Sequence, residues 1–249
     1  MRILALKGAF LLVVNILSFC ALKEYYDGRQ VRLVSALLPS IVKVQPIGPI
    51  YRYMPYFISD SEIGFKRQRV GFGVMGHGSG AFISKDGLIV TCAHVVEGTN
   101  LVELSLWGDK DRLSPNGYKT KGKLLGCVIG RDIKHDAALI RVIQPPIGYK
   151  PVTVAKSVKK GLSVLTIGFP GPFNKYVTSG VISGSLEGSI YSDLVIAPGN
   201  SGGGVFNSKG ELVGLARFMT GPENIPVYQG FSGLTPLKSI RELVEKYGG

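Results

Sequence analysis

Three residues of this sequence are of the types that together activate a serine nucleophile: His94, Asp136 and Ser201. A serine hydroxyl is a weak nucleophile at neutral pH, and it reacts when a neutral imidazole accepts its proton. A buried carboxylate holds that imidazole in the required tautomer and stabilises its charged form. The three residues follow one another at spacings of 42 and 65 positions, so the serine can come from a different part of the fold than the other two. This order predicts nucleophilic catalysis in a cleft between two halves of the chain.

The local sequence around each of these residues fits its expected role. His94 lies near the end of the strand-like segment TCAHVVEG, and Asp136 begins the strand-like part of HDAALIRV. Ser201 lies in the glycine-rich turn APGNSGGGVFN. Glycines let such a turn adopt backbone conformations that aim N–H groups at a developing oxyanion. We therefore expect an oxyanion hole at the backbone of Gly199, Asn200 and Ser201.

Two other histidines and one other acid compete for these roles. His135 adjoins Asp136 and would point to the opposite side of a strand, so we expect it at the surface. His77 lies in a glycine-rich stretch and has no evident partner in the sequence. Asp132 lies four positions before Asp136 and is the alternative acid.

The composition of the chain excludes several classes of protein. Its 249 residues are 45% apolar and only 18% charged, which argues against a disordered chain. The 34 glycines are not periodic, so they exclude a collagen-like repeat and indicate many tight turns. Three cysteines, Cys20, Cys92 and Cys127, are too few for a disulfide framework and match no zinc spacing.

Short segments rich in β-branched residues and separated by turn signals predict an all-β barrel or sandwich. A proline break near residue 145 divides them into halves of similar length, so we expect two tandem β-barrels. The expected boundaries are about 34–144 for the first barrel, about 150–234 for the second, and 235–247 for a C-terminal helix capped by Thr235. The segment Pro46–Asp60, with three prolines and four aromatic residues, is expected to be a loop.

The N-terminus has the layout of an export signal. Residues Gly8–Leu22 form an uncharged apolar run that Arg2 and Lys7 precede. We expect residues 1–30 to be a signal sequence or a membrane anchor and residues 31–249 to be one exported domain outside the cytoplasm. Both a cleaved signal and an uncleaved anchor fit this segment, and an N-terminal helix packed on the domain is the alternative.

The chain is strongly basic, with 29 lysine and arginine residues against 17 acids and a net charge of +12. Such a charge favours contact with anionic surfaces, but no nucleic-acid-binding motif accompanies it. We therefore expect a solvated basic surface and no nucleic-acid partner, with a nucleic-acid-associated protease as the weaker alternative.

Over longer blocks, the sequence resembles the HtrA/DegP-type trypsin-like serine proteases. The blocks that carry the resemblance are GSGAFISKDGLIVTCAHVVEG, DIKHDAALIRV, LSVLTIGFPGPFNKYVTSGVISG and SDLVIAPGNSGGGVFNSKGELVGL, within a likeness that runs from about Leu38 to Leu243. The resemblance implies two tandem six-stranded barrels and endopeptidase activity without a cofactor or a metal. It also implies His94, Asp136 and Ser201 as base, orienting acid and nucleophile, and a role in quality control of unfolded or damaged proteins.

The chain departs from the family where the usual C-terminal PDZ domain would follow. It ends six residues after Leu243, so we expect this PDZ domain to be absent. A protease dedicated to one processing event, and a non-cleaving chaperone or binding protein on the same fold, are the alternative functions. In the family, aromatic residues of an N-terminal loop mediate trimer contacts, which implies a homotrimer through Tyr51, Tyr53, Tyr56 and Phe57.

The resemblance also implies where an extended polypeptide substrate binds. In the family, the strand after the nucleophile loop pairs with the substrate backbone, and GELVGLARFM aligns with that strand. Arg217, Phe218 and Met219 would then contact the substrate, and Ile196 would face Met219 from the loop before Ser201. Met219 and Ile196 should form a shallow apolar pocket for Val, Ala, Leu or Ile rather than a pocket for Lys or Arg.

Overall fold

The structure is a computed structural model that describes residues 28–59, 62–106, 112–113, 119–120, 123–146, 148–171, 175–186, 188–217 and 232–249. Residues 28–37 are helical and belong to an N-terminal unit, whereas Leu38–Gly249 form a second, compact unit that carries all the elements below. Most of the expected export segment, residues 1–27, lies outside the described residues. Within the described ranges, no helix is both long enough and apolar enough to cross a membrane.

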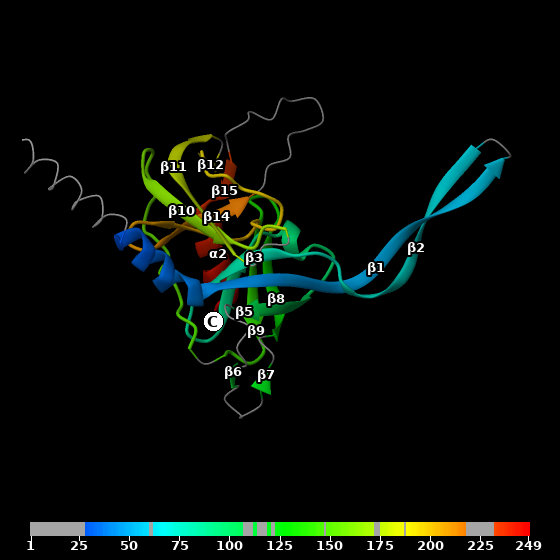
Figure 1. Cartoon of the computed structure of the whole chain (residues 1–249), viewed down its shortest axis with the longest axis horizontal. Coiled ribbons are helices and arrows are strands. Elements are labelled where there is room, and N and C mark those ends of the chain that lie inside the picture. Colours follow the sequence, from blue (N-terminus) through cyan, green and yellow to red (C-terminus); the bar gives the residue numbers. More distant parts are fainter. Residues whose placement is uncertain are drawn as a thin grey trace, which may run out of the picture. The chain divides into compact units, whose positions relative to one another are not determined.

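The first half of the compact unit forms a closed β-barrel (Figure 1). Its six strands are β1 (Ile41–Ser59), β3 (Gly78–Phe82), β4 (Leu88–Thr91), β9 (Ala137–Val142), β8 (Lys123–Asp132) and β5 (Leu101–Leu106). They are hydrogen-bonded in that order, and β5 pairs back with the first part of β1 to close the barrel. The remaining elements of this half are β2 (Glu62–Val74), which pairs with β1, the 3-10 helices η1 (Leu38–Ser40) and η2 (His94–Val96), and the short pair β6 (Arg112–Leu113) and β7 (Lys119–Thr120).

The second half forms another closed barrel. Its strands are β10 (Ser163–Gly168), β11 (Tyr176–Leu186), β12 (Ser189–Ser192), β15 (Ser232–Thr235), β14 (Leu212–Arg217) and β13 (Gly204–Asn207), hydrogen-bonded in that order. The helix α2 (Leu237–Tyr247) follows. The prediction of an all-β fold with two tandem six-stranded barrels is therefore confirmed.

Burial follows the residue pattern of the strands. β8 alternates between exposed and buried positions, as expected for a strand with one face on a barrel core. β4 and β14 are apolar on both faces, and almost all of their residues are buried. The largest fully buried side chains that fill the two barrels are Ile41, Phe82, Ile89, Leu104, Leu139 and Ile140 in the first and Ile167, Phe206, Leu212, Leu215 and Leu234 in the second.

The expectation of a loop over Pro46–Asp60 is wrong, because β1 continues to Ser59 as a long strand paired with β2. Asp60 lies outside the described residues. The carbonyl of Pro46 accepts a hydrogen bond from the N–H of Met75 on the β2 side. Successive residues of a strand face opposite edges, so Pro49 and Pro55 face the edge that lies away from β2. A proline at such a position costs no hydrogen bond of the ladder.

The C-terminal helix is present, but its expected cap is wrong. α2 begins at Leu237 and has Pro236 at its N-cap, in an extended conformation and without a side-chain cap. Thr235 instead ends β15, and its hydroxyl donates to the backbone carbonyl of Asp136 at 3.0 Å. A partner from the first barrel thus takes the hydroxyl that was expected to cap the helix.

Substitution of Phe82 measures how much the core of the first barrel stabilises the fold. The Phe82 ring is fully buried and packs against Tyr149 with 4.2 Å between the ring centroids, so Phe82→Ala removes apolar burial and leaves a cavity. We expect the free energy of unfolding in urea to fall by about 3–5 kcal/mol. Phe72→Ala removes an exposed ring from β2 and should change the free energy of unfolding by less than about 0.5 kcal/mol. Equal effects of the two substitutions would contradict the assignment of Phe82 to the core.

Candidate active site

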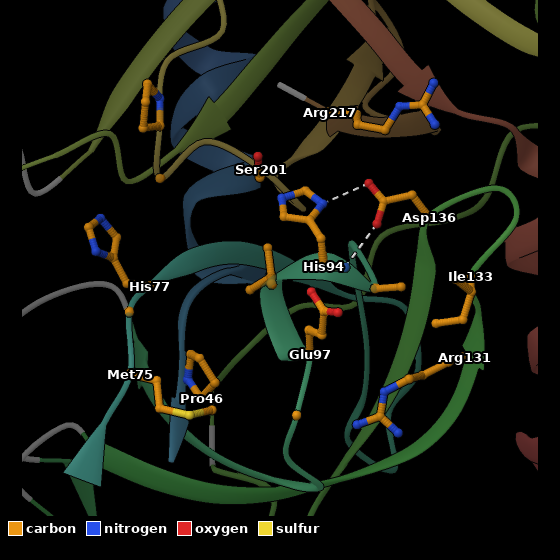
Figure 2. A pocket seen from close by; sticks show the side chains of 16 residues that line it. Pro46, Met75, His77, His94, Glu97, Arg131, Ile133, Asp136, Ser201 and Arg217 are labelled. Carbon is orange, nitrogen blue, oxygen red and sulfur yellow. Dashed lines mark hydrogen bonds and ion pairs between the residues drawn. The ribbon is translucent and has the colours of Figure 1, made fainter. Parts of the chain in front are cut away.

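A pocket of about 1080 Å³ lies between the two barrels and is lined by residues from both. His94 and Asp136 come from the first barrel, and Ser201 and Arg217 come from the second. Figure 2 shows Ser201 beside the imidazole of His94, on the side away from Asp136. The structure therefore brings together in one pocket the three residues that the sequence predicted for nucleophilic catalysis.

His94 and Asp136 form a contact through two hydrogen bonds. Nδ1 of His94 lies 2.8 Å from Oδ2 of Asp136, and the backbone N–H of His94 donates to Oδ1 of the same carboxylate at 2.9 Å. When Nδ1 carries the proton, Nε2 of the ring is left as an acceptor. The Asp136 side chain is 14% exposed and the His94 side chain 45% exposed. The carboxylate is thus shielded, whereas the imidazole faces the pocket.

The barrel strands and one unusual backbone conformation aim Asp136 at His94. β4 pairs with β9, and His94 follows β4 while Asp136 precedes β9, so the two residues emerge at the same end of the barrel. Asp136 has a φ of 58° and is the one described non-glycine residue with a positive φ. Aspartate tolerates this left-handed region better than most residues do. The turn before β9 can therefore present the carboxylate to His94.

The surroundings of Asp136 favour its ionised form. Burial alone would raise the pKa of Asp136, but hydrogen bonds from the side chain and the backbone N–H of His94 outweigh it, and the charges of His94 and Arg217 act in the same direction. The pKa of this carboxyl group is therefore held below its ordinary value. Asp136 is ionised at neutral pH, as an acid that orients a histidine must be.

The turn that carries Ser201 is held by Ser79 of β3, which belongs to the other barrel. The N–H of Ser79 donates to the carbonyl of Ser201 at 2.8 Å, and the hydroxyl of Ser79 donates to the carbonyl of Gly199 at 2.7 Å. The same hydroxyl accepts the N–H of Phe169 at 2.9 Å. One buried serine of the first barrel thus fixes two points of the turn in the second.

The glycines of this turn are required by its backbone. Gly199 and Gly202 have φ values of 98° and 82°, where a side chain would be strained. Of the three residues expected to form an oxyanion hole, Asn200 already donates its N–H to the carbonyl of Ala197 at 2.9 Å. The Asn200 amide is thus engaged within the turn itself.

Asp132, the alternative acid, belongs to a second histidine–aspartate pair outside the pocket. Nδ1 of His135 lies 2.8 Å from Oδ2 of Asp132, and the N–H of His135 donates to Oδ1 at 3.1 Å. The hydroxyl of Ser239 donates to Oδ2 of Asp132 at 2.6 Å, so this serine contacts the carboxylate rather than the imidazole. A nucleophile needs the imidazole as its partner, and this group therefore does not repeat the arrangement in the pocket.

Cys92 lies next to the catalytic candidates and completes a group whose ligand atoms lie within 4.8 Å of one another, with His94 and Asp136. Burial in the first place, and then the charge of Asp136, raises the pKa of the Cys92 thiol far above its ordinary value. A metal ligand must be the thiolate, so this buried thiol is poorly suited to hold a metal. Its sulfur lies 3.5 Å from the carbonyl oxygen of Ala216 and 3.8 Å from Oγ1 of Thr235, which makes Cys92 a packing residue between the barrels.

The expected substrate-binding residues are only partly covered by the described ranges. Arg217, at the end of β14, lines the pocket, whereas Ile196 is half-buried and does not line it. Phe218 and Met219 lie outside the described residues.

Sequence reasoning missed three residues of the site. His77 lines the pocket, and its Nε2 lies 3.1 Å from the carbonyl oxygen of Phe169. Ser79 donates a hydrogen bond to the backbone carbonyl of Gly199, close to Ser201, and Thr235 donates one to the backbone carbonyl of Asp136. Each of these two bonds joins one barrel to the other. The partners in each bond are more than ninety residues apart along the chain, so no local pattern could have revealed them.

The part of the chain that forms this pocket is similar in sequence to known peptidases. Residues 78–215 match a family model described as a trypsin-like peptidase domain. A protein of Halomonas elongata named "Probable periplasmic serine endoprotease DegP-like" is 36% identical over 146 residues, which are 55% of this chain and 28% of that protein. The "Putative serine protease HhoB" of Synechocystis is 32% identical over 152 residues, 56% of this chain and 34% of that protein. The chain therefore spans about a third of the length of these curated relatives.

A solved structure agrees with the fold. The crystal structure of the serine endoprotease from Yersinia pestis matches with a TM-score of 0.62 and 22% sequence identity, over 86% of this chain and 65% of that one. At this identity, the match shows the double-barrel fold alone.

Asp136→Asn tests which acid orients His94. An amide cannot hold the imidazole in the tautomer that leaves Nε2 free to accept a proton, so we expect kcat for hydrolysis of unfolded casein to fall by about 10³–10⁴-fold at pH 7. Asp132→Asn is the matched control, because it alters a similar pair outside the pocket, and it should change kcat by less than about threefold. A larger loss in Asp132→Asn than in Asp136→Asn would reverse the assignment.

The same variant has a pH-dependent effect on stability. Because the pKa of Asp136 is lowered in the folded chain, its carboxylate stabilises the fold above its unfolded pKa of about 3.9. This contribution is lost as the pH falls through the lowered folded value. The free energies of unfolding of the wild type and Asp136→Asn should therefore converge as the pH falls below about 4, and a difference that does not change with pH would contradict the lowered pKa.

Proposed function

Since the chain belongs to the trypsin-like peptidase family, we propose that it is a serine endopeptidase that cleaves polypeptides through an acyl-enzyme on Ser201. The observation that carries the proposal is the hydrogen-bonded pair of His94 and Asp136 in the pocket that Ser201 also lines. The pair supplies an oriented base, and the serine supplies a nucleophile that such a base can activate.

In the proposed mechanism, Nε2 of His94 accepts the proton of Ser201 as its Oγ forms a bond to the carbonyl carbon of the substrate. The carbonyl oxygen becomes an oxyanion, to which the amides of Gly199 and Ser201 donate hydrogen bonds. The intermediate then collapses, the C–N bond breaks, and His94 gives its proton to the leaving amine. His94 then deprotonates a water molecule, whose oxygen forms a bond to the carbonyl carbon of the ester. The bond from this carbon to Oγ of Ser201 breaks, the acid product leaves, and His94 gives the proton back to Oγ.

Asp136 acts through His94 in this mechanism. Its carboxylate keeps the Nδ1 proton in place and stabilises the imidazolium that forms in each step. The low pKa of Asp136 supports this role, because the acid must stay ionised while the imidazole gains charge.

We further propose that the substrates are unfolded or damaged polypeptides outside the cytoplasm. The proposal is supported by the names of the relatives, which describe periplasmic DegP-like endoproteases, and by the signal-like sequence of residues 1–30. A dedicated processing protease and a non-cleaving binding protein are the alternative functions, and the second is disfavoured by the intact set of catalytic side chains. A homotrimer through Tyr51, Tyr53, Tyr56 and Phe57 and an association with the membrane stay predictions.

Labelling of the nucleophile tests the proposed chemistry. A fluorophosphonate probe should label the wild type with one probe per chain, and Ser201→Ala should abolish labelling and lower the turnover of unfolded casein by about 10³-fold or more. Ser239→Ala is the matched control, since Ser239 also lies beside a histidine–aspartate pair, and it should be labelled as the wild type is. Labelling that survives in Ser201→Ala but is lost in Ser239→Ala would refute the proposal.

The residue preference before the cut tests the proposed substrate pocket. We propose that Met219 forms an apolar wall of the substrate pocket, so cleavage should follow Val, Ala, Leu or Ile. Ile196, the second residue expected in this wall, does not line the pocket between the barrels. Pocket size discriminates by only about 1–3 kcal/mol per methylene, so Met219→Gly should shift cleavage to larger apolar residues without abolishing it. Leu186→Ser, an exposed substitution on β11, should leave the cut sites unchanged. The cut sites are read by sequencing the fragments of a denatured protein, and a majority after Lys or Arg would refute the pocket.

A further inference from the structure

The hairpin formed by β2 and the outer part of β1 is a two-stranded ribbon that extends from the first barrel (Figure 1). We call its residues 48–59 and 62–74 the arm. Within the described residues, β1 pairs with β3 and β5 only up to Ile47, and beyond this point it pairs with β2 alone. The arm therefore has no barrel strand on either side of it.

Large apolar side chains are exposed on both faces of the arm. Because side chains alternate along a strand, the register of the hairpin assigns them to two faces. The exposed members of the first face are Tyr51, Tyr53, Phe65 and Phe72, and those of the second are Ile50, Met54, Tyr56 and Ile58. Many large apolar side chains exposed on one hairpin are typical of a site that binds another molecule.

The charge of the arm adds a second preference. The sequence from 48 to 74 carries the four cations Arg52, Lys66, Arg67 and Arg69, against the two acids Asp60 and Glu62. The Arg67 guanidinium lies 3.9 Å from the centre of the Tyr51 ring, so cationic and aromatic groups share one face. The arm is thus complementary to a ligand with apolar and acidic groups.

Residues next to the base of the arm form part of the pocket wall. Pro46 and Met75 line the pocket, and the N–H of Met75 donates to the carbonyl of Pro46 at 2.9 Å, which joins the two strands at this point. Figure 2 shows Met75 and His77 toward one end of the pocket and Arg217 toward the other, with Ser201 between them. The surface of the arm is therefore continuous with the pocket that holds the nucleophile.

The direction in which a substrate chain runs through the pocket follows from the positions of Arg217 at one end and Met75 at the other. If the part of the substrate before the cut pairs with β14, as the family resemblance implies, it lies toward Arg217. The part after the cut then leaves the pocket toward Met75 and the arm. We propose that the arm binds the segment of an unfolded polypeptide that follows the scissile bond, through apolar and acidic side chains of that segment; the inference rests on the proposed endopeptidase function.

Side-chain contacts of the exposed apolar and cationic residues account for this binding. Addition of a strand at the open edge of β1 is weakened because Pro49 and Pro55 offer no N–H there. Insertion of the arm into a lipid bilayer is disfavoured by the charged residues of its sequence, which include Arg52, Glu62 and Lys66. The predicted homotrimer through Tyr51, Tyr53, Tyr56 and Phe57 is the competing use of this surface, and it brings the cations of several arms together.

A length series of peptides tests the proposal. The arm is twelve residues long on the β1 side, or about 40 Å when extended. A fluorescein-labelled peptide of about eight residues around a cut site is compared with the same peptide lengthened by about twelve residues rich in Leu, Phe, Asp and Glu, either after or before the cut. Affinity is measured by fluorescence anisotropy on the full chain with Ser201→Ala, so that no peptide is cleaved.

We expect the extension after the cut to lower Kd by about tenfold, and the extension before the cut to have a smaller effect. The double variant Tyr53→Ser/Phe65→Ser, whose side chains are 67% and 66% exposed, should abolish the gain from the extension after the cut. The matched control Ile143→Ser/Leu186→Ser, at 57% and 65% exposure away from the arm, should keep it. Replacing Asp and Glu of the extension by Asn and Gln should weaken the gain.

Equal Kd values for the short peptide and the peptide extended after the cut would overturn the proposal. Two other results would also overturn the proposal. If the arm variant lowers the particle mass in light scattering but leaves peptide affinity unchanged, the arm is a contact between copies. If it releases the protein from anionic vesicles but leaves peptide affinity unchanged, the arm binds lipid. A failure of the arm proposal is distinguished from a failure of the endopeptidase proposal by two measurements on chains that retain Ser201. These are fluorophosphonate labelling and cleavage of the short peptide. If both persist while the extension has no effect, the arm proposal fails and the endopeptidase proposal stands.

Discussion

The hydrogen bonds of one buried serine, Ser79, hold the two halves of the candidate active site in position. Its hydroxyl donates to Gly199 and accepts from Phe169, while its own N–H and carbonyl bind the carbonyl of Ser201 and the hydroxyl of Thr91. A single hydrogen bond stabilises a fold by only about 0.5–1.5 kcal/mol net, but leaving a buried partner unpaired costs more. A satisfied network of this kind therefore selects one arrangement of the nucleophile turn against all others. Since β3 pairs with β4, the strand that leads to His94, the same residue relates the nucleophile to the base.

The acid of the site is also held from both barrels. The carboxylate of Asp136 faces His94 in the first barrel, while its backbone carbonyl accepts the hydroxyl of Thr235 from the second. Its left-handed backbone is less favourable than an ordinary one, and these contacts offset that cost. The ionised state depends on the same contacts, because without the hydrogen bonds from His94 the burial of the group would raise its pKa. The hydrogen bonds from His94 therefore determine both the position and the ionised state of the Asp136 carboxylate.

The parts of the structure that the sequence predicted are those that depend on short segments. Alternating apolar residues and turn signals were sufficient to predict the barrels, and the glycines around Ser201 were sufficient to predict a turn whose backbone only glycine can adopt. The long hairpin was mistaken for a loop because proline was expected to end a strand, and this rule does not hold where the proline faces an open edge. The cap at Thr235 was mistaken because a residue far along the chain competes for its hydroxyl. Such long-range partners are a property of the fold and leave no local pattern.

The arm differs from the rest of the chain because almost nothing in it is buried. A two-stranded ribbon is only marginally stable by itself in water, and here apolar side chains face solvent on both sides. A partner that covers these side chains stabilises the paired form of the arm, since it binds that form in preference to an open one. The first hydrogen bond of the ribbon, from Met75 to Pro46, lies in the wall of the catalytic pocket. The pairing of the two arm strands and the position of this pocket wall therefore depend on the same hydrogen bond. A chain bound along the arm thus stabilises the end of the pocket through which it leaves.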